Sequence, residues 1–366
     1  MAITELATAS QIQKWDNKFM DEYVRANAMA EYMGEDPMNP IVVKLQLMDA
    51  GKQINIPLFG RLKGKGVQDN ERLSGSEESL DNSNSPITVR WNRNGVEIPK
   101  SLEHMTELDF RAQSKSELRL WAQESLRDDL LSALLAFNSR SFLASTPLDY
   151  YNSVSEAVKD AWLAANRDRV LFGAARANNV ANDHSAALLT IDNTADKMSS
   201  AVGSLAKSMA RKADPHIRPF SVEETKGREF FVMFTHPDAF RDLKNDPVMV
   251  AANRDARERN VATNPLFQDG DLIYGCIIYR EVPEIPTLVG AGAGGIDVAP
   301  NFLCGAGALG VAWGQKPQSK LKKEDDYGFF TGLGIEECRG AAKLWRNDGT
   351  VQNGMVTVYT AGVASA

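Results

Sequence analysis

The chain has 366 residues, of which 43% are hydrophobic and 24% charged, and its formal net charge is −7. This composition is typical of folded protein and allows about two or three domains. The negative charge argues against general affinity for nucleic acid, which needs clustered cations. The cysteines, Cys276, Cys304 and Cys338, lie far apart, which argues against a disulfide framework or a zinc site and favours reduced thiols.

The N-terminal segment, residues 1–44, is expected to be an arm. Its first ten residues contain Glu5 and no apolar core, unlike a signal peptide. Residues 9–33 place apolar side chains at helical spacing, which predicts an amphipathic helix ending near Gly34. The alternative is an ordinary helix packed on the core. No membrane association is expected, because the longest apolar stretch, 287–314, is broken by many glycines.

Residues 45–104 are expected to form an extended β-hairpin. Residues 53–58 and 87–93 alternate apolar and polar side chains, as half-buried strands do, and a long charged connection joins them. Such a hairpin buries little of itself and exposes strand edges that invite pairing. A protein that packs against copies of itself has a use for such an element.

The hairpin also carries charges of both signs, close together, which favours complementary contacts between subunits. A basic arm precedes an acidic run, and an aromatic residue follows in the second strand. The candidate inter-subunit contacts are Arg61, Lys63, Lys65, Arg72, Glu77, Glu78, Trp91 and Arg93.

Residues 106–137 give the clearest helical pattern in the chain. Apolar residues recur every four positions, and charged residues fill the opposite face. A helix of this length spans roughly 45 Å, which suits a rod against which other elements lie. The repeated apolar positions are Leu118, Ala122, Leu126, Leu130 and Leu134.

The remaining elements mix helices and strands without a regular βαβ rhythm, which predicts the α+β class. A buried strand over 230–235 leads through His236, Pro237 and Asp238 into a helix that reaches Lys244. Further helices are expected over 155–166, 194–212 and 248–259, and strands over 271–282, 302–314, 332–345 and 355–360.

Catalytic and metal-binding patterns are weak. No two of the four histidines stand three or four positions apart, so a helical metal-ligand pair is not predicted. His236 and Asp238 could belong to a catalytic triad, but no G-x-S-x-G motif supplies a nucleophile, and a helix cap is the simpler interpretation. Adjacent carboxylates such as Glu336 and Glu337 are interpreted as solvated or partner-facing charge. No enzymatic activity, cofactor or metal is expected.

Four stretches, in order along the chain, together resemble the major capsid proteins of tailed phages of the podovirus type. The first, Leu73 to Leu80, is similar to the L-x-G-x-E-E-x-L signature of that family. The others are Leu108 to Leu131 with Arg111, Leu120 and Trp121; Phe231 to Pro237 followed by Asp242, Leu243 and Lys244; and Asn264 to Phe267 with Gly270, Tyr274 and Gly275.

The resemblance implies the Hong Kong 97-type capsid fold. Its parts would be an N-terminal arm (1–44), an extended loop (45–104), a spine helix with the peripheral domain (105–227), an axial domain (228–317) and return strands of the peripheral domain (318–366). The implied function is self-assembly, as pentamers and hexamers, into an icosahedral shell that encloses double-stranded DNA without sequence-specific binding.

The implied partners are further copies of the chain, scaffolding and portal proteins, and a decoration protein. The implied location is the virion capsid, after assembly in the bacterial host cytoplasm. Three alternatives remain open at this stage. One is a metabolic enzyme of the α+β class, which a convergent titratable cluster would distinguish. The others are a non-viral shell of the same fold that encloses cargo, and a phage tail or decoration protein.

Overall fold

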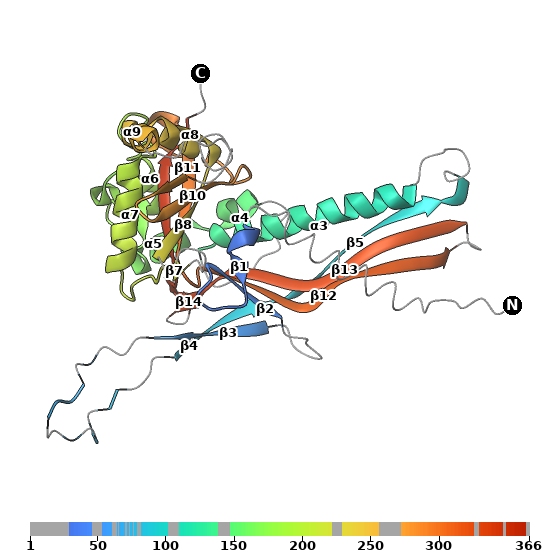
Figure 1. The fold of residues 1–366 in the computed structure, drawn as a ribbon. Helices are drawn as coiled ribbons and strands as arrows, with labels where there is room; N and C mark the ends of the chain where they lie inside the picture. Colours follow the sequence, from blue (N-terminus) through green and yellow to red (C-terminus); the bar gives the residue numbers. More distant parts are fainter. Residues whose placement is uncertain are drawn as a thin grey trace.

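The computed structural model describes residues 29–45, 53–60, 64, 66–69, 72, 74–75, 77–78, 82–101, 110–137, 147–221, 229–255, 272–325, 329–346 and 349–363. Figure 1 shows three parts: a body of helices and strands, a long sheet that runs out from it beside one long helix, and a narrow hairpin that projects in another direction.

The body is built on a mixed sheet. Its strand order is β6 (Val170–Phe172), β16 (Met355–Ala361), β11 (Val298–Cys304), β8 (Glu229–Thr235), β10 (Ile277–Glu281) and β9 (Leu272–Tyr274), with β7 (Phe220–Ser221) paired to β8. Every residue of β11 and β16 is buried, as is typical of central strands that are covered on both faces. Helices accompany this sheet: α5 (Glu156–Ala165), α6 (His184–Leu188), α7 (Ser200–Lys212), α8 (Pro237–Asn245) and α9 (Pro247–Asp255).

Local capping explains where these helices begin. Helix α8 starts at His236, whose side chain accepts from the Asp238 N–H, and Pro237 occupies its first turn, as the sequence predicts. Helix α7 begins only at Ser200, after the cap Ser199, so the expected start near Thr194 is wrong. Asp192 instead accepts hydrogen bonds from the N–H groups of the two residues that follow Asn193, within a turn.

The long sheet has the order β1 (Met33–Gly34), β2 (Ile41–Leu45), β12 (Leu309–Asp325), β13 (Phe330–Lys343) and β5 (Arg90–Pro99). Helix α3 (Phe110–Leu134) runs along one face of this sheet and packs against β13, β5 and β12 (Figure 1). It confirms the predicted long helix, and all five of the repeated apolar residues named above are buried.

The projecting hairpin is shorter than the sequence indicates. It consists of β3 (Gln53–Phe59) and β4 (Asn82–Thr88), paired antiparallel. Strand β5 leaves it at residue 89 and pairs with β13 instead, and Ile41–Leu45 pairs with β12. The expectation of one hairpin over 45–104 is therefore corrected, because alternation identifies a strand but not its partner.

The base of the hairpin packs on the face of the long sheet opposite α3. Ile56 and Ile87 share one apolar cluster with Ala312 of β12, whereas the neighbouring Val311 belongs to the α3 side. Glycine makes this contact possible: a Cβ at Gly340 would lie 2.2 Å from the Thr88 carbonyl oxygen. Around Val311 and Ala312, the sheet is thus covered by α3 on one face and by the hairpin on the other.

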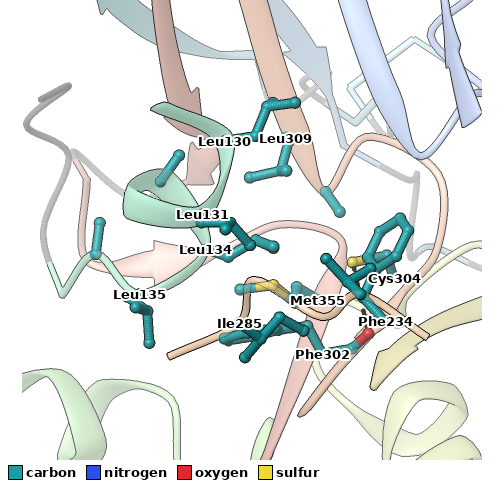
Figure 2. Close-up of a cluster of buried hydrophobic side chains, with 14 of the residues drawn as sticks. Leu130, Leu131, Leu134, Leu135, Phe234, Ile285, Phe302, Cys304, Leu309 and Met355 are labelled. Carbon is teal, nitrogen blue, oxygen red and sulfur yellow. Dashed lines mark hydrogen bonds between the residues drawn. The ribbon is translucent and has the colours of Figure 1, made fainter. Parts of the chain in front are cut away.

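The C-terminal part of α3 lies where the long sheet meets the body. Figure 2 shows Leu130, Leu131 and Leu134 of α3 beside Leu309 of β12, with body residues such as Phe302 below them. These side chains are almost fully buried, so at this junction α3 and the long sheet share one core with the body.

The strand pairing crosses the expected domain segments. The boundary expected at residue 317 falls inside β12, and the body sheet takes strands from the segments 105–227, 228–317 and 318–366. These segments are therefore not separate sheets, because long-range strand pairing joins them. The helix expected over 9–33 lies mostly outside the described residues; its end forms a 3-10 turn, Ala30–Tyr32, after the buried Met29.

The smaller elements are α4 (Pro147–Ser153), the 3-10 turns Arg176–Asn178 and Ala293–Gly295, and a ribbon of β14 (Trp345–Arg346) with β15 (Val351–Gln352). Among the described residues, no helix combines the length and the hydropathy needed to cross a bilayer. With both helices and strands and no repeated βαβ unit, the fold is α+β, as expected.

Candidate subunit-contact surfaces

The loop between β3 and β4 holds most of the candidate contacts. Arg72, Glu77 and Glu78 are exposed on it. Glu77 accepts a long hydrogen bond of 3.5 Å from the Gly75 N–H, and Glu78 lies close against the Gly64 backbone on the opposite arm of the loop. Arg61, Lys63 and Lys65 lie outside the described residues.

Trp91 and Arg93 lie on β5 and not on the hairpin, which separates them from the other candidates. Between them, Asn92 donates to Ser125 of α3 at 2.9 Å, so it faces the helix. By strand alternation, Trp91 and Arg93 occupy the opposite face. Trp91 is 57% exposed there. A large exposed aromatic residue on an open sheet face is typical of an interaction surface.

A buried ionic network fixes α3 on the sheet. The Arg339 guanidinium of β13 donates to Asp129 of α3 at 2.9 Å and 2.8 Å, to Glu337 at 2.5 Å and to the Ser125 hydroxyl at 2.6 Å. Burial raises the pKa of the Asp129 carboxyl, and the adjacent Arg339 opposes that rise. The interpretation of Glu337 as solvated charge is wrong, because its side chain is only 1% exposed.

A second buried cation lies where α3 and the long sheet meet the body. The Lys343 ammonium donates to the Ala136 carbonyl at 2.8 Å and lies 5.4 Å from the Trp162 ring centroid and 5.8 Å from that of Trp345. Burial lowers the pKa of Lys343 to about 7. The strand pattern did not reveal this residue, because a lysine near a strand end is ordinarily exposed.

The histidine that resembled a triad fragment has a structural role. His236 Nδ1 accepts from the Asp238 N–H at 3.2 Å, and Nε2 lies 2.8 Å from the Thr287 hydroxyl. One ring nitrogen therefore caps α8, and the other contacts Thr287 in the segment that follows β10. Burial lowers the pKa of His236, and the neighbouring Asp238 opposes that shift.

The carboxylates of Glu156, Asp160 and Asp183 gather near the start of α6, the one such group among the described residues. Two of them have clear structural roles. Asp160 accepts from the His184 N–H at 2.8 Å, and Asp183 accepts from the Ala186 N–H at 2.9 Å as the helix cap. Glu156 forms a 3.4 Å ion pair with Lys159. The cluster is accounted for by capping and pairing.

A cavity of about 510 Å³ lies at the root of the hairpin, and we call it the root pocket. Its walls come from β2, from the end of β3, from residues 216–218 and 306–307 of the body, and from β14. Its cations are Lys44, Arg218 and Arg346, with His216 also in the lining. The sequence did not reveal this site, because these cations lie in distant parts of the chain.

Comparison with known proteins agrees with this architecture. A family model described as phage capsid protein matches residues 4–364. The major capsid protein of Pseudomonas phage KPP25 is 25% identical, over 98% of this chain and 97% of that protein.

Two solved structures are similar throughout their length. The capsid asymmetric unit of cyanophage Pam1 has 35% sequence identity and a TM-score of 0.79, with all of both chains covered. The capsid of Ralstonia phage GP4 has 21% identity and a TM-score of 0.69, over 92% of this chain and 90% of the other, and it supports the fold. The spine helix, the projecting hairpin and the body thus occur together in capsid subunits. The chain belongs to the phage capsid protein family and has the Hong Kong 97-type fold.

Proposed function

We propose that this chain is a major capsid protein that assembles, as pentamers and hexamers, into a closed icosahedral shell around phage DNA. The observation that carries the proposal is the match of nearly the whole chain to the phage capsid protein family, together with its likeness to the Pam1 capsid subunit at 35% identity. Catalysis is not part of this proposal, because the family is a structural one.

The shape of the subunit supports assembly. The strands of the hairpin pack on the long sheet, and the described parts of its loop project away from the body (Figure 1). The sheet face that carries Trp91 is open. Contacts made by such limbs are head-to-tail, and they close into rings when the rotation between subunits is fixed. Summed over several neighbours, the buried area would reach the roughly 2,000 Å² or more of permanent complexes.

Each part of the subunit has a place in this proposal. The segment 228–317, which supplies α8, α9 and β8 to β11 of the body, would be the axial domain that meets its symmetry mates at the centre of a capsomer. The segment 105–227, which contains helix α3, would form the spine helix and the peripheral domain together with the strands after residue 318. The net charge of −7 suits a wall that holds DNA without gripping it, since many phosphate contacts would oppose packaging and release.

The partners follow from closed assembly. We propose that scaffolding and portal proteins, and a decoration protein where the phage has one, contact this chain during or after shell formation in the host cytoplasm. Their binding would guide curvature and the site of DNA entry. These partners are proposed from the family alone.

The test is electron microscopy of the chain expressed with the proteins encoded beside it. The proposal predicts closed particles of uniform diameter with fivefold vertices, built mainly of this chain. Tubes or flat sheets would favour a tail protein, and binding only to the outside of a preformed shell would favour a decoration protein. Either result would contradict the proposal.

A further inference from the structure

The root pocket combines an apolar floor with a cationic rim. Val42, Ile56 and Leu58 line the floor, and Phe59 at its edge is 55% exposed. Leu45 and Met38, also in the lining, are 40% and 41% exposed. Exposed apolar side chains around a concave site are typical of a binding surface.

The cations of the rim are held in place by the hairpin itself. Lys44 donates to the Asn55 carbonyl at 2.5 Å, and Arg346 donates to the Phe59 carbonyl at 3.2 Å. Arg218 is exposed beside them. Among the described residues that line the pocket, Glu35 is the one carboxylate, so cations are in excess there. Such a site favours an anionic ligand that also carries apolar side chains.

The same chain contains a segment of that description. Residues 67–81, in the sequence between β3 and β4, carry five carboxylates and one cation, with three aliphatic residues, Val67, Leu73 and Leu80. Glu77 and Glu78, which the structure describes, are exposed. The segment therefore complements both the rim and the floor of the root pocket.

None of the described loop residues lines the root pocket of its own copy. Phe59, at the end of β3, lines the root pocket, and the chain then continues outward into the loop. Figure 1 shows the described parts of the loop pointing away from the body and from β14. Two different surfaces that match each other form a heterologous contact, in which each copy binds the next.

We propose that the root pocket of one copy receives the loop segment 67–81 of a neighbouring copy, with Glu77 and Glu78 facing Arg218, Lys44 and Arg346. This inference rests on the proposed shell function and names the contact that links adjacent subunits. The carboxylates form charge-assisted hydrogen bonds with the rim, and the aliphatic residues cover the exposed floor.

The first test is a disulfide between copies. In a Cys276→Ser background, tagged chains with Glu78→Cys are coexpressed with untagged chains with Arg218→Cys, and the purified particles are oxidised. We expect a mixed dimer in which the two cysteines are joined. A matched control replaces Arg218→Cys by Val289→Cys, at a residue that is 80% exposed and does not line the pocket, and should give no mixed dimer.

The second test exchanges charge. Glu78→Arg and Arg218→Glu alone should each lower the yield of closed particles at least tenfold, whereas the two together should restore at least half of it. Thermal melts of the subunits check that each variant folds. The neutral variants Glu78→Gln and Arg218→Gln should have smaller effects than the reversals. If the cysteine variants do not assemble, the charge exchange decides.

The outcomes separate this contact from the shell itself. Normal particles from either single reversal, or no rescue by the pair, would overturn the contact. So would oxidised particles with no Glu78–Arg218 disulfide. Absence of closed particles from the unmodified chain would contradict the proposed function instead.

Discussion

Arg339 of β13 and Asp129 of α3 form a buried ion pair, with the guanidinium Nε 2.9 Å from the carboxylate Oδ2. Glu337 binds the same guanidinium, so one cation faces two carboxylates between helix and sheet. Because one cation serves two carboxylates, we expect the loss of Arg339 to destabilise the subunit more than the loss of one acid. The cation is the member that the network cannot lose, because its removal leaves two buried acids together.

We therefore expect Arg339→Met to destabilise the subunit by about 3–5 kcal/mol, the range for breaking a buried pair. Asp129→Asn leaves one cation with one carboxylate and should cost about 1 kcal/mol, close to one hydrogen bond. Urea unfolding of the unassembled subunit measures both. A larger loss for Asp129→Asn than for Arg339→Met would contradict this account of the network.

Because Lys343 is buried, we expect the free energy of unfolding to depend on pH in the alkaline range. Its pKa is lowered from 10.5 to about 7 in the folded chain, so between these pH values the unfolded chain binds the proton and the folded chain does not. The free energy of unfolding should rise with pH across that window by up to about 1.4 kcal/mol per unit, and then level off.

Lys343→Met should remove this rise and stabilise the subunit at pH 7, because the ammonium no longer has to be buried. The matched control is Lys322→Met, whose side chain is 50% exposed and pairs with Glu97 at 2.9 Å. That variant should keep the rise. Denaturant melts between pH 6.5 and 10 measure it, and an unchanged slope in Lys343→Met would show that another group is responsible.

Because His184 is buried, we expect the stability of the folded chain to depend on pH in the acid range. The imidazole is 1% exposed among Phe137, Tyr151, Trp162, Phe172 and Tyr359. Burial lowers its pKa to about 3. The unfolded chain therefore takes up the proton first as pH falls below 6.5, and stability should fall by up to about 1.4 kcal/mol per unit toward pH 3.

His184→Phe should keep the aromatic packing and reduce this acid loss. The backbone N–H still donates to Asp160, so the start of α6 is preserved. Thermal melts of the unassembled subunit between pH 3.5 and 7 provide the measurement. Equal slopes for the variant and the original chain would rule out His184 as the source.

The packing of the hairpin on the long sheet depends on Gly340. An added Cβ would lie 2.2 Å from the Thr88 carbonyl, a backbone atom that cannot rotate away. Gly340→Ala should therefore lift β4 from the sheet and cost about 1–3 kcal/mol, as overpacking does. Gly334→Ala is the control, because a Cβ there would first meet an atom at 3.4 Å. Equal losses of stability for the two variants in denaturant melts would contradict the claim that Gly340 is needed for this packing.

Local signals predicted much of this fold from sequence. The four-residue apolar repeat located α3, and the order strand, His236, Pro237 located β8 and α8, because periodicity and caps act within a few residues. Strand partners could not be predicted in the same way. The pattern places β5 in the hairpin and residues 41–44 in the arm, because alternation shows a buried face but not the strand alongside.

The contact surfaces were harder to predict, since they depend on residues that only the tertiary fold brings together. Lys44, Arg218 and Arg346 become neighbours through the packing of β2, the body and β14. One signal was available and missed: Ile335, Glu337, Arg339 and Ala341 alternate along one strand face, so Glu337 shares the buried side of its apolar neighbours. The candidates Arg61, Lys63 and Lys65 remain predictions.

The central claim is that the projecting hairpin acts between copies. Cryo-electron microscopy of assembled particles tests it most directly, because the path of each hairpin can be traced in density. The account predicts a closed shell in which every β3–β4 hairpin crosses onto an adjacent subunit. A closed shell in which the loop folds back on its own body would contradict it.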